Sequence, residues 1–269
     1  MIRISKAETY GWEAAIRGMR NPMNSWDKSD SYPAVDCGKC GIIDREGICH
    51  PKEHDCSEFA CYAVGENDLS LMKRLAAAGN DHGKFLRMIN VTVDVEAPLY
   101  WWKEFDTYKV GTVANSCSTM HKIQAKEFTL EDFSTDHLSQ TNLIIMKMVV
   151  DALNNARLDF LSQKDKRDWW QMIQLLPSSY NQTRNVMLNY EVLTNIYKSR
   201  KDHKLDEWRE FCRWIESLPY SELIIQKEQR EKQQLINGID PDTATDAAVD
   251  YAVQMAKDAA RHYSFEKEE

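Results

Sequence analysis

The 269-residue chain is long enough for one large α/β domain or two small ones with a sizeable core. Its 34 basic and 42 acidic residues give a formal net charge of −8, whereas proteins that coat nucleic acid carry a positive surplus. This balance argues against a nucleic-acid polymer as partner, although it is compatible with a local basic pocket for one phosphate.

The N-terminal sequence does not resemble a secretory signal. Residues 1–20 lack its apolar core and small-residue cleavage site, and no apolar run in the chain is long enough to span a membrane. We therefore expect a cytoplasmic protein with no membrane partner. Seven cysteines, an odd number in such a chain, favour reduced thiols or a metal site over a disulfide framework.

Proline and glycine punctuate residues 22–66, which indicates a long loop or a small inserted module, with a cysteine-rich part at about 33–63. Two thiols separated by two residues and followed by further cysteine and histidine side chains are typical of a tetrahedral zinc site. The candidate ligands of a structural zinc are Cys37, Cys40, Cys49 and Cys56, with His50 and His54 nearby. The alternative is that these thiols are unligated in a variable loop.

Three segments with clear local patterns follow. Asn67 or Asp68 is a suitable N-cap for a helix that ends at Gly79. Residues 89–95 alternate apolar and polar side chains, which predicts a strand with one buried face. Pro98 suits the first turn of a further helix, LYWWKEF, whose aromatic side chains predict either core packing or a stacking surface.

From about residue 142 the apolar spacing predicts helices throughout. The apolar positions that mark them are Leu143, Met146, Val150, Leu153 and Phe160 in the first helix, Val186, Leu193 and Ile196 in the second, and Leu205, Trp208, Phe211 and Ile215 in the third. A charged segment and an alanine-rich helix at about 243–261 complete the chain.

The second of these helices carries polar side chains on its apolar face. At about 100° per residue, Asn189 and Arg200 share a face with Leu193 and Ile196. A buried arginine is costly unless an anion or a strong acceptor meets it. Two interpretations stay open, an internal salt bridge to a nearby carboxylate and a ligand pocket lined by this face.

Two blocks of sequence resemble the flavin-dependent thymidylate synthases. In LLPSSYNQTRNVMLNYEVLTNIYKSRKDHKLDEWREF, the spacing from Pro177 to Asn189, Asn195 and Arg200 matches the family's C-terminal block without a gap, and His203 and Glu207 follow its His-x-x-x-Glu pattern. The earlier segment DHGKFLRMINVTVDVEAPLYWWKEFDTYKVGTVANSCSTMH is similar in order and length to a second block. There, His82 matches a turn histidine, and residues 97–98 match an Ala-Pro pair.

This resemblance implies an α+β fold, with a central twisted, mostly antiparallel sheet flanked by helices and a helical C-terminal half. It implies one domain over residues 1–225 that carries the cysteine-rich insertion at about 33–63, followed by a charged linker and a C-terminal helix over 226–269. The family is tetrameric with sites shared between subunits, so a homo-oligomer is expected.

The resemblance also implies an activity and a set of site residues. In the family, reduced FAD carries a methylene unit from methylenetetrahydrofolate to C5 of the nucleotide dUMP, and NADPH reduces the flavin. Asn189 and Asn195 are then expected to contact the flavin, and Arg200 to polarise the pyrimidine. The other implied residues are His82, Lys84, Tyr108 and Lys109 for the cofactor and Glu104, Asn115 and Ser118 for the substrate.

Several charged positions differ from the family's motif. Residues 107–109 are Thr-Tyr-Lys where the motif has Arg-His-Arg, and Glu104 replaces a glutamine. The arginine that holds the nucleotide phosphate is Ile173 here. The residues that could supply positive charge from new positions, if they are not ordinary surface cations, are Lys84, Arg87 and Lys109.

These differences leave two functional hypotheses. The retained asparagines and Arg200 favour an enzyme that alkylates a pyrimidine nucleotide at C5, with dUMP or another pyrimidine nucleotide as substrate. The altered motif favours a protein that binds flavin or nucleotide without turnover.

Overall fold

The computed structural model describes residues 2–35 and 60–225. All of them lie in the first of two compact units, Met1–Gln226, and the second unit is Lys227–Glu269. The four candidate zinc ligands, Cys37, Cys40, Cys49 and Cys56, lie outside the described residues, as does the helix expected at about 243–261.

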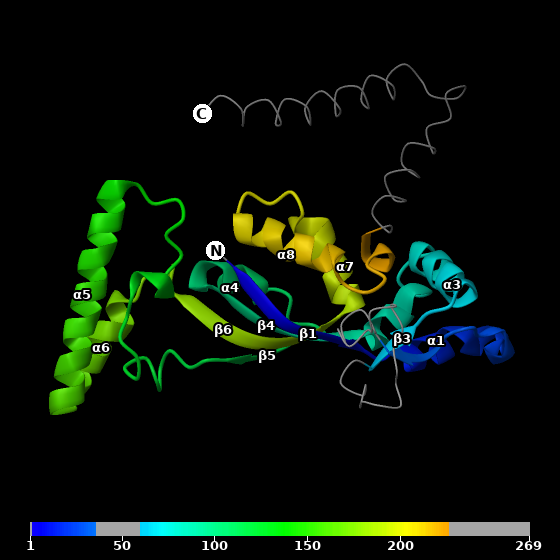
Figure 1. Ribbon diagram of the computed structural model, residues 1–269, viewed down its shortest axis with the longest axis horizontal. Helices are drawn as coiled ribbons and strands as arrows, with labels where there is room; N and C mark the ends of the chain where they lie inside the picture. Colours follow the sequence, from blue (N-terminus) through cyan, green and yellow to red (C-terminus); the bar gives the residue numbers. More distant parts are fainter. Residues whose placement is uncertain (1, 36–59, 226–269) are drawn as a thin grey trace, which may run out of the picture. The chain divides into compact units, whose positions relative to one another are not determined.

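A four-stranded antiparallel sheet organises the first unit. Its strands are β1 (Arg3–Tyr10), β4 (Asn90–Pro98), β6 (Asn181–Asn189) and β5 (Val113–Ser116), and they lie in the order β1-β4-β6-β5. Helices cover one face of this sheet (Figure 1). The α+β fold class with a central antiparallel sheet is therefore confirmed.

The alternation predicted for residues 89–95 is what places β4 in the centre of the sheet. Val91, Val93 and Val95 are almost completely buried on the helix-covered face, because successive strand residues point to opposite faces. On the other face, the Asp94 carboxylate accepts a hydrogen bond of 2.8 Å from Asn185 Nδ2 and pairs with Lys6 Nζ at 3.2 Å. One face is thus apolar core and the other a polar network.

Three helices lie on the valine face, namely α4 (Leu99–Phe105), α7 (Tyr190–Arg200) and α8 (Asp206–Glu216) (Figure 1). The aromatic side chains of LYWWKEF are core: Trp101, Trp102 and Phe105 are all buried. The centroids of the Trp101 and Trp208 rings are 4.7 Å apart, so α4 and α8 are joined through aromatic packing. Of the two interpretations of this segment, core packing is the one observed.

Helices α1 (Trp12–Arg20), α3 (Glu66–Ala77) and η4 (Gly83–Met88) pack on the same core. The other elements in this part of the chain are η1 (Asn21–Met23), η2 (Trp26–Lys28) and a two-stranded sheet of β2 (Tyr32–Val35) and β3 (Ala60–Ala63). A buried ion pair links α1 to α3, with 2.6 Å between Arg20 Nε and Asp68 Oδ1. Asp68 is therefore a buried residue inside α3, and Gly65, not Asn67 or Asp68, is the N-cap.

A second core lies around α5 (Gln140–Gln163) and α6 (Lys166–Leu175), with η5 (Leu130–Asp132) beside them. Met146, Val150 and Leu153 of α5 are buried in it, which confirms the predicted first helix. Outside this core, α5 exposes five large apolar side chains, Ile144, Ile145, Met148, Leu158 and Leu161. An apolar surface of this kind on one helix is typical of an interaction face.

The prediction for residues 181–189 was wrong. We expected Val186 to mark a helix, but it pairs with Val93 in β6, between β4 and β5. The sequence pattern did not predict this strand, because the polar Gln182 and Arg184 lie on the same helix-covered face as Val186 and Leu188 and interrupt the apolar alternation. Arg184 is accommodated there by stacking, with its Cζ 4.2 Å from the centre of the Trp102 ring. Helix α7 begins only at Tyr190, after the strand ends.

Candidate functional site

The C-terminal end of α7 presents Arg200 to α4 and to the segment after it. Arg200 Nη1 lies 2.7 Å from Glu104 Oε2 of α4, and Arg200 Nε donates a hydrogen bond of 3.0 Å to the Tyr108 hydroxyl. The Arg200 side chain is 19% exposed and that of Glu104 is 36% exposed, so both remain within reach of a ligand. No described residue bonds Arg200 Nη2, which leaves N–H donors available.

Aromatic rings fix the plane of this guanidinium. Arg200 Cζ lies 4.8 Å from the centre of the Trp208 ring and 5.8 Å from that of Tyr108. Trp208 Nε1 also donates to Glu104 Oε2 at 3.0 Å. Cation–π contact and a charge-assisted hydrogen bond both favour the charged, oriented arginine.

His203 completes this group, which we call the Arg200 cluster (Glu104, Tyr108, Arg200, His203 and Trp208). Its Nε2 lies 3.5 Å from Glu104 Oε2, while its Nδ1 accepts a hydrogen bond of 3.2 Å from the Leu205 amide. Burial lowers the pKa of His203, and the neighbouring Arg200 lowers it further, against an opposing effect of Glu104. The geometry therefore fits a neutral imidazole whose proton is on Nε2.

Of the two interpretations of Arg200, the internal ion pair is present. Its partner Glu104 is itself a residue that the resemblance placed at the substrate. Two expected site residues thus bond to each other. Because the Arg200–Glu104 ion pair is only partly buried, Glu104 balances the charge of the guanidinium while the guanidinium stays accessible to a ligand.

The two asparagines do not share the Arg200 face. Asn189 is the last residue of β6 and the N-cap of α7, where its Oδ1 accepts a hydrogen bond of 3.0 Å from the Val192 amide. Asn195 is exposed, while its neighbours Ile196 and Leu193 are buried on the core side. The expectation that Asn189 lies on a helix face with Arg200 is corrected, because α7 starts one residue after it.

The cations expected near the cofactor are all on the surface. His82 is the N-cap of η4, and Lys84 and Arg87 lie within η4, which packs against α1, α3 and α7. Lys109 follows α4 and is also exposed. No described residue forms an ion pair with Lys84, Arg87 or Lys109.

The expected substrate residues Asn115 and Ser118 lie elsewhere, at and after the edge strand. Asn115 is on β5, opposite Asn185 of β6. Ser118 Oγ accepts hydrogen bonds from the amides of Met120 and His121, at 3.2 and 2.9 Å. Both side chains are exposed.

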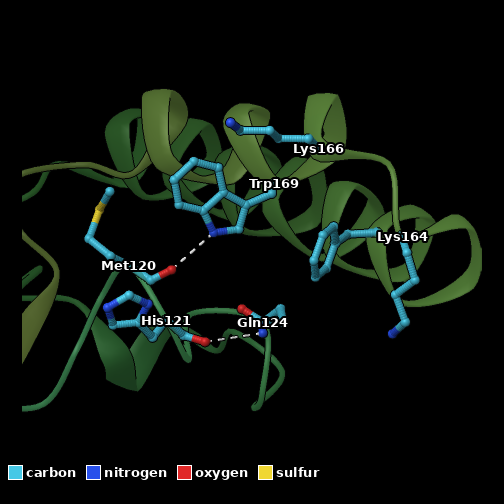
Figure 2. A pocket seen from close by; sticks show the side chains of 7 residues that line it. Met120, His121, Gln124, Lys164, Lys166 and Trp169 are labelled. Atoms are coloured by element: carbon cyan, nitrogen blue, oxygen red, sulfur yellow. Dashed lines mark hydrogen bonds between the residues drawn. The ribbon is translucent and has the colours of Figure 1, made fainter.

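A separate pocket of about 340 Å³ lies between α5, α6 and the loop that follows Ser118 (Figure 2). Its lining residues are Met120, His121, Gln124, Phe160, Lys164, Lys166 and Trp169. No sequence motif marks this pocket, because its residues come from two segments, 120–124 and 160–169, that are 36 or more positions apart and meet only in the folded protein.

Within residues 2–35 and 60–225, no group of three or more His, Cys, Asp or Glu side chains could hold a metal ion. No helix in those ranges is both long and apolar enough to cross a membrane.

Comparison with known proteins identifies the fold. No protein-family model matches the sequence, and no curated protein matches it. Two solved structures of the flavin-dependent thymidylate synthase ThyX from Helicobacter pylori, each with FAD and dUMP, match with TM-scores of 0.55 and 0.56. The matches cover 82% and 84% of this chain and 96% and 99% of those chains, at 16% sequence identity.

The chain has the ThyX-like fold. At this identity the likeness establishes the architecture alone. In this ThyX-like fold the expected site residues form separate groups. The Arg200 cluster lies at the ends of α4 and α7, the exposed cations lie on and near η4, and Asn115 and Ser118 lie at the β5 edge.

Proposed function

We propose that this protein binds FAD and a pyrimidine nucleotide and reductively methylates the pyrimidine at C5, with methylenetetrahydrofolate as carbon donor and NADPH as reductant. The observation that carries the proposal is the oriented guanidinium of Arg200. Held by Glu104, Tyr108 and Trp208, it keeps Nη2 available for a ring oxygen.

The chemistry asked of this chain is electrostatic. The flavin, when bound, supplies reducing equivalents and carries the one-carbon unit. An N–H donor fixed at a pyrimidine oxygen stabilises negative charge that develops on the ring, and a donor held in place beforehand needs little reorganisation. Arg200 fits this role, since its guanidinium bonds to Glu104 and Tyr108 and stacks on Trp208.

The fit to a flavin and a nucleotide phosphate is partial. Asn195 has an exposed amide for hydrogen bonding, whereas the Oδ1 of Asn189 is engaged in capping α7. Ile173, at the position of the family's phosphate-binding arginine, packs against the second core. An isoleucine cannot bind phosphate. The proposed alternative sources of positive charge, Lys84, Arg87 and Lys109, lie on η4 and after α4, not on α6, so they would hold a phosphate at a different place from Ile173.

Glu104 favours a second candidate substrate, a nucleotide whose ring carries an exocyclic amine, as in cytosine. A carboxylate can only accept hydrogen bonds, so it matches the N4 amine of cytosine and opposes the O4 oxygen of uracil. Glu104 Oε2 already accepts bonds from Arg200 and Trp208, and no described residue donates to Oε1. Glu104 Oε1 is therefore the atom that would distinguish dCMP from dUMP.

We propose that the protein assembles as a homotetramer in the cytoplasm. The exposed apolar side chains of α5 support an assembly, because burying such side chains between subunits removes them from water.

The candidate zinc site is a further proposal. Metal analysis of the purified protein tests it: one zinc per chain would support the site, and no zinc would contradict it.

The function is tested in two steps on the purified full-length protein. The first is its absorption spectrum, where flavin bands at one flavin per chain support the proposal and their absence after reconstitution with FAD contradicts it. The second adds dUMP or dCMP with methylenetetrahydrofolate and NADPH and looks for a C5-methylated nucleotide by mass spectrometry. Flavin binding without product would support the binding-protein alternative.

A further inference from the structure

The α5–α6 pocket is basic although the chain as a whole is acidic. Lys164, Lys166 and His121 line it, and no lining residue carries a carboxylate. Among the described residues, neither lysine forms an ion pair. The nearest acidic residue in sequence, Asp165, is engaged elsewhere, since it accepts hydrogen bonds from the Arg167 amide at 2.9 Å and from the Arg167 guanidinium at 2.8 and 2.6 Å.

The pocket also has a fixed aromatic wall. Trp169 Nε1 donates a hydrogen bond of 3.1 Å to the Met120 carbonyl, which holds the indole ring in one orientation (Figure 2). Figure 2 shows Trp169 between Lys166 and the segment that carries His121 and Gln124. Phe160 adds a second ring, over which Lys164 Nζ lies at 5.6 Å from the centre.

A buried acceptor in the pocket lining has no donor. Gln124 Nε2 donates to the His121 carbonyl at 3.3 Å, which identifies Oε1 as the other end of the amide. Gln124 Oε1 is buried and has no hydrogen-bond partner among the described residues. Buried acceptors are normally paired, so an N–H or O–H group of a ligand would satisfy it.

From these features we infer that the α5–α6 pocket is a binding site for a mononucleotide, with the base stacked on Trp169 and the phosphate held by Lys164 and Lys166. Lysines bind phosphate as mobile point charges, and a fixed indole stacks on any base because every base has a π-face. At about 340 Å³ the volume lies at the lower end of the range for small-molecule pockets, which suits a single nucleotide. The site needs no residue of the Arg200 cluster and does not rest on the proposed function.

Calorimetric titration of the full-length protein with AMP, UMP, ribose 5-phosphate and uridine tests this inference. AMP and UMP are expected to bind, each about tenfold more tightly than ribose 5-phosphate, which has no base, and than uridine, which has no phosphate. Uridine binding as tightly as UMP would overturn the phosphate assignment. Absence of binding by either nucleotide would overturn the site.

Substitutions locate the binding. The double variant Lys164→Asn/Lys166→Gln should weaken AMP binding about tenfold, and asparagine is suitable at Lys164 because φ is 58° there and asparagine tolerates that conformation. The control Lys147→Gln, an exposed lysine of α5 outside the lining, should change AMP affinity less than twofold. Unchanged AMP affinity in the double variant would contradict the inference.

Two further variants distinguish base stacking from phosphate binding, and the α5–α6 pocket from the Arg200 cluster. Trp169→Leu should weaken AMP binding about tenfold and leave ribose 5-phosphate unaffected. Arg200→Gln should leave AMP affinity within twofold of the unchanged protein. Loss of AMP binding in Arg200→Gln would assign the nucleotide to the Arg200 cluster and not to this pocket, whereas failure of the methylation assay leaves the inference intact.

Discussion

Glu104 Oε2 and Arg200 Nη1 lie 2.7 Å apart, although 96 positions separate the two residues in the sequence. The pair connects the end of α4 to the end of α7 and holds the arginine against Trp208. It also places a negative charge beside the cation proposed to act on the pyrimidine.

Replacing Glu104 should change nucleotide preference. In Glu104→Gln an amide N–H replaces one carboxylate oxygen, so it can donate to the O4 of uracil. We expect affinity to shift by about tenfold from dCMP toward dUMP, measured by titration of the flavin-loaded protein. Glu210→Gln, an α8 carboxylate paired with Arg213, is the matched control and should leave the ratio unchanged. An unaltered ratio in Glu104→Gln would remove the assignment of Glu104 to the base.

Removing the guanidinium should reduce turnover. Loss of one oriented donor at developing charge typically lowers kcat by about 100- to 1000-fold, and we expect this range for Arg200→Gln. Steady-state rates of methylated-nucleotide formation measure it. The control is Arg213→Gln, an exposed arginine of α8, which should keep full activity. Full activity in Arg200→Gln would instead leave the arginine with a purely structural role.

The buried ion pair between α1 and α3 should dominate local stability. Arg20 and Asp68 are 3% and 0% exposed, and the other Asp68 oxygen accepts hydrogen bonds of 2.7 Å from both Ser29 and Ser31. Asp68→Ala leaves the guanidinium buried without its counter-charge, which should lower the free energy of unfolding by about 3–5 kcal/mol in denaturant titrations.

The exposed pair Arg17–Glu13 on α1 gives a comparison for that variant. Its side chains are 64% and 70% exposed and 3.5 Å apart, so Glu13→Ala should cost less than about 1 kcal/mol. Equal losses for Asp68→Ala and Glu13→Ala would show that burial does not set the strength of the α1–α3 link.

Stability should depend on pH through His203. Burial lowers its pKa in the folded protein below the ordinary value of 6.5, so at mildly acidic pH the unfolded chain binds more protons than the folded one. The free energy of unfolding should therefore fall as pH drops below about 6.5, where the unfolded histidine becomes charged. His203→Asn, which keeps an acceptor for the Leu205 amide, should show a smaller slope of unfolding free energy against pH. An identical slope would exclude His203 as its source.

A charge on the exposed face of α5 should disturb assembly. Met148 is 65% exposed and lies among other apolar side chains of that helix. If subunits meet there, Met148→Glu would bury a charge and should shift the tetramer toward smaller species in light scattering. The control Lys103→Glu changes charge by more at an exposed position of α4, a different helix, so a larger effect in that variant would place the interface elsewhere.

Part of the fold and of the site can be predicted from local sequence patterns. The alternation around Val93 determined a central strand, and the helical spacing of α5 and α8 determined two helices, because these patterns depend only on residues near each other in the chain. The spacing from Pro177 to Arg200 likewise marked the arginine and implied the fold that comparison confirmed. Asn115, Ser118 and the exposed cations are named by that resemblance, and their roles stay predictions.

Tertiary structure decided the rest, because it depends on neighbours that are distant in sequence. Arg184 is held in β6 by stacking on Trp102 and by an ion pair with Asp106, both distant in sequence, so no local pattern revealed that strand. The partner of Arg200 was likewise open until the fold brought Glu104 from α4 to its guanidinium. The α5–α6 pocket exists only because two helices pack together, which places the lysines after α5 beside a loop 40 or more residues earlier.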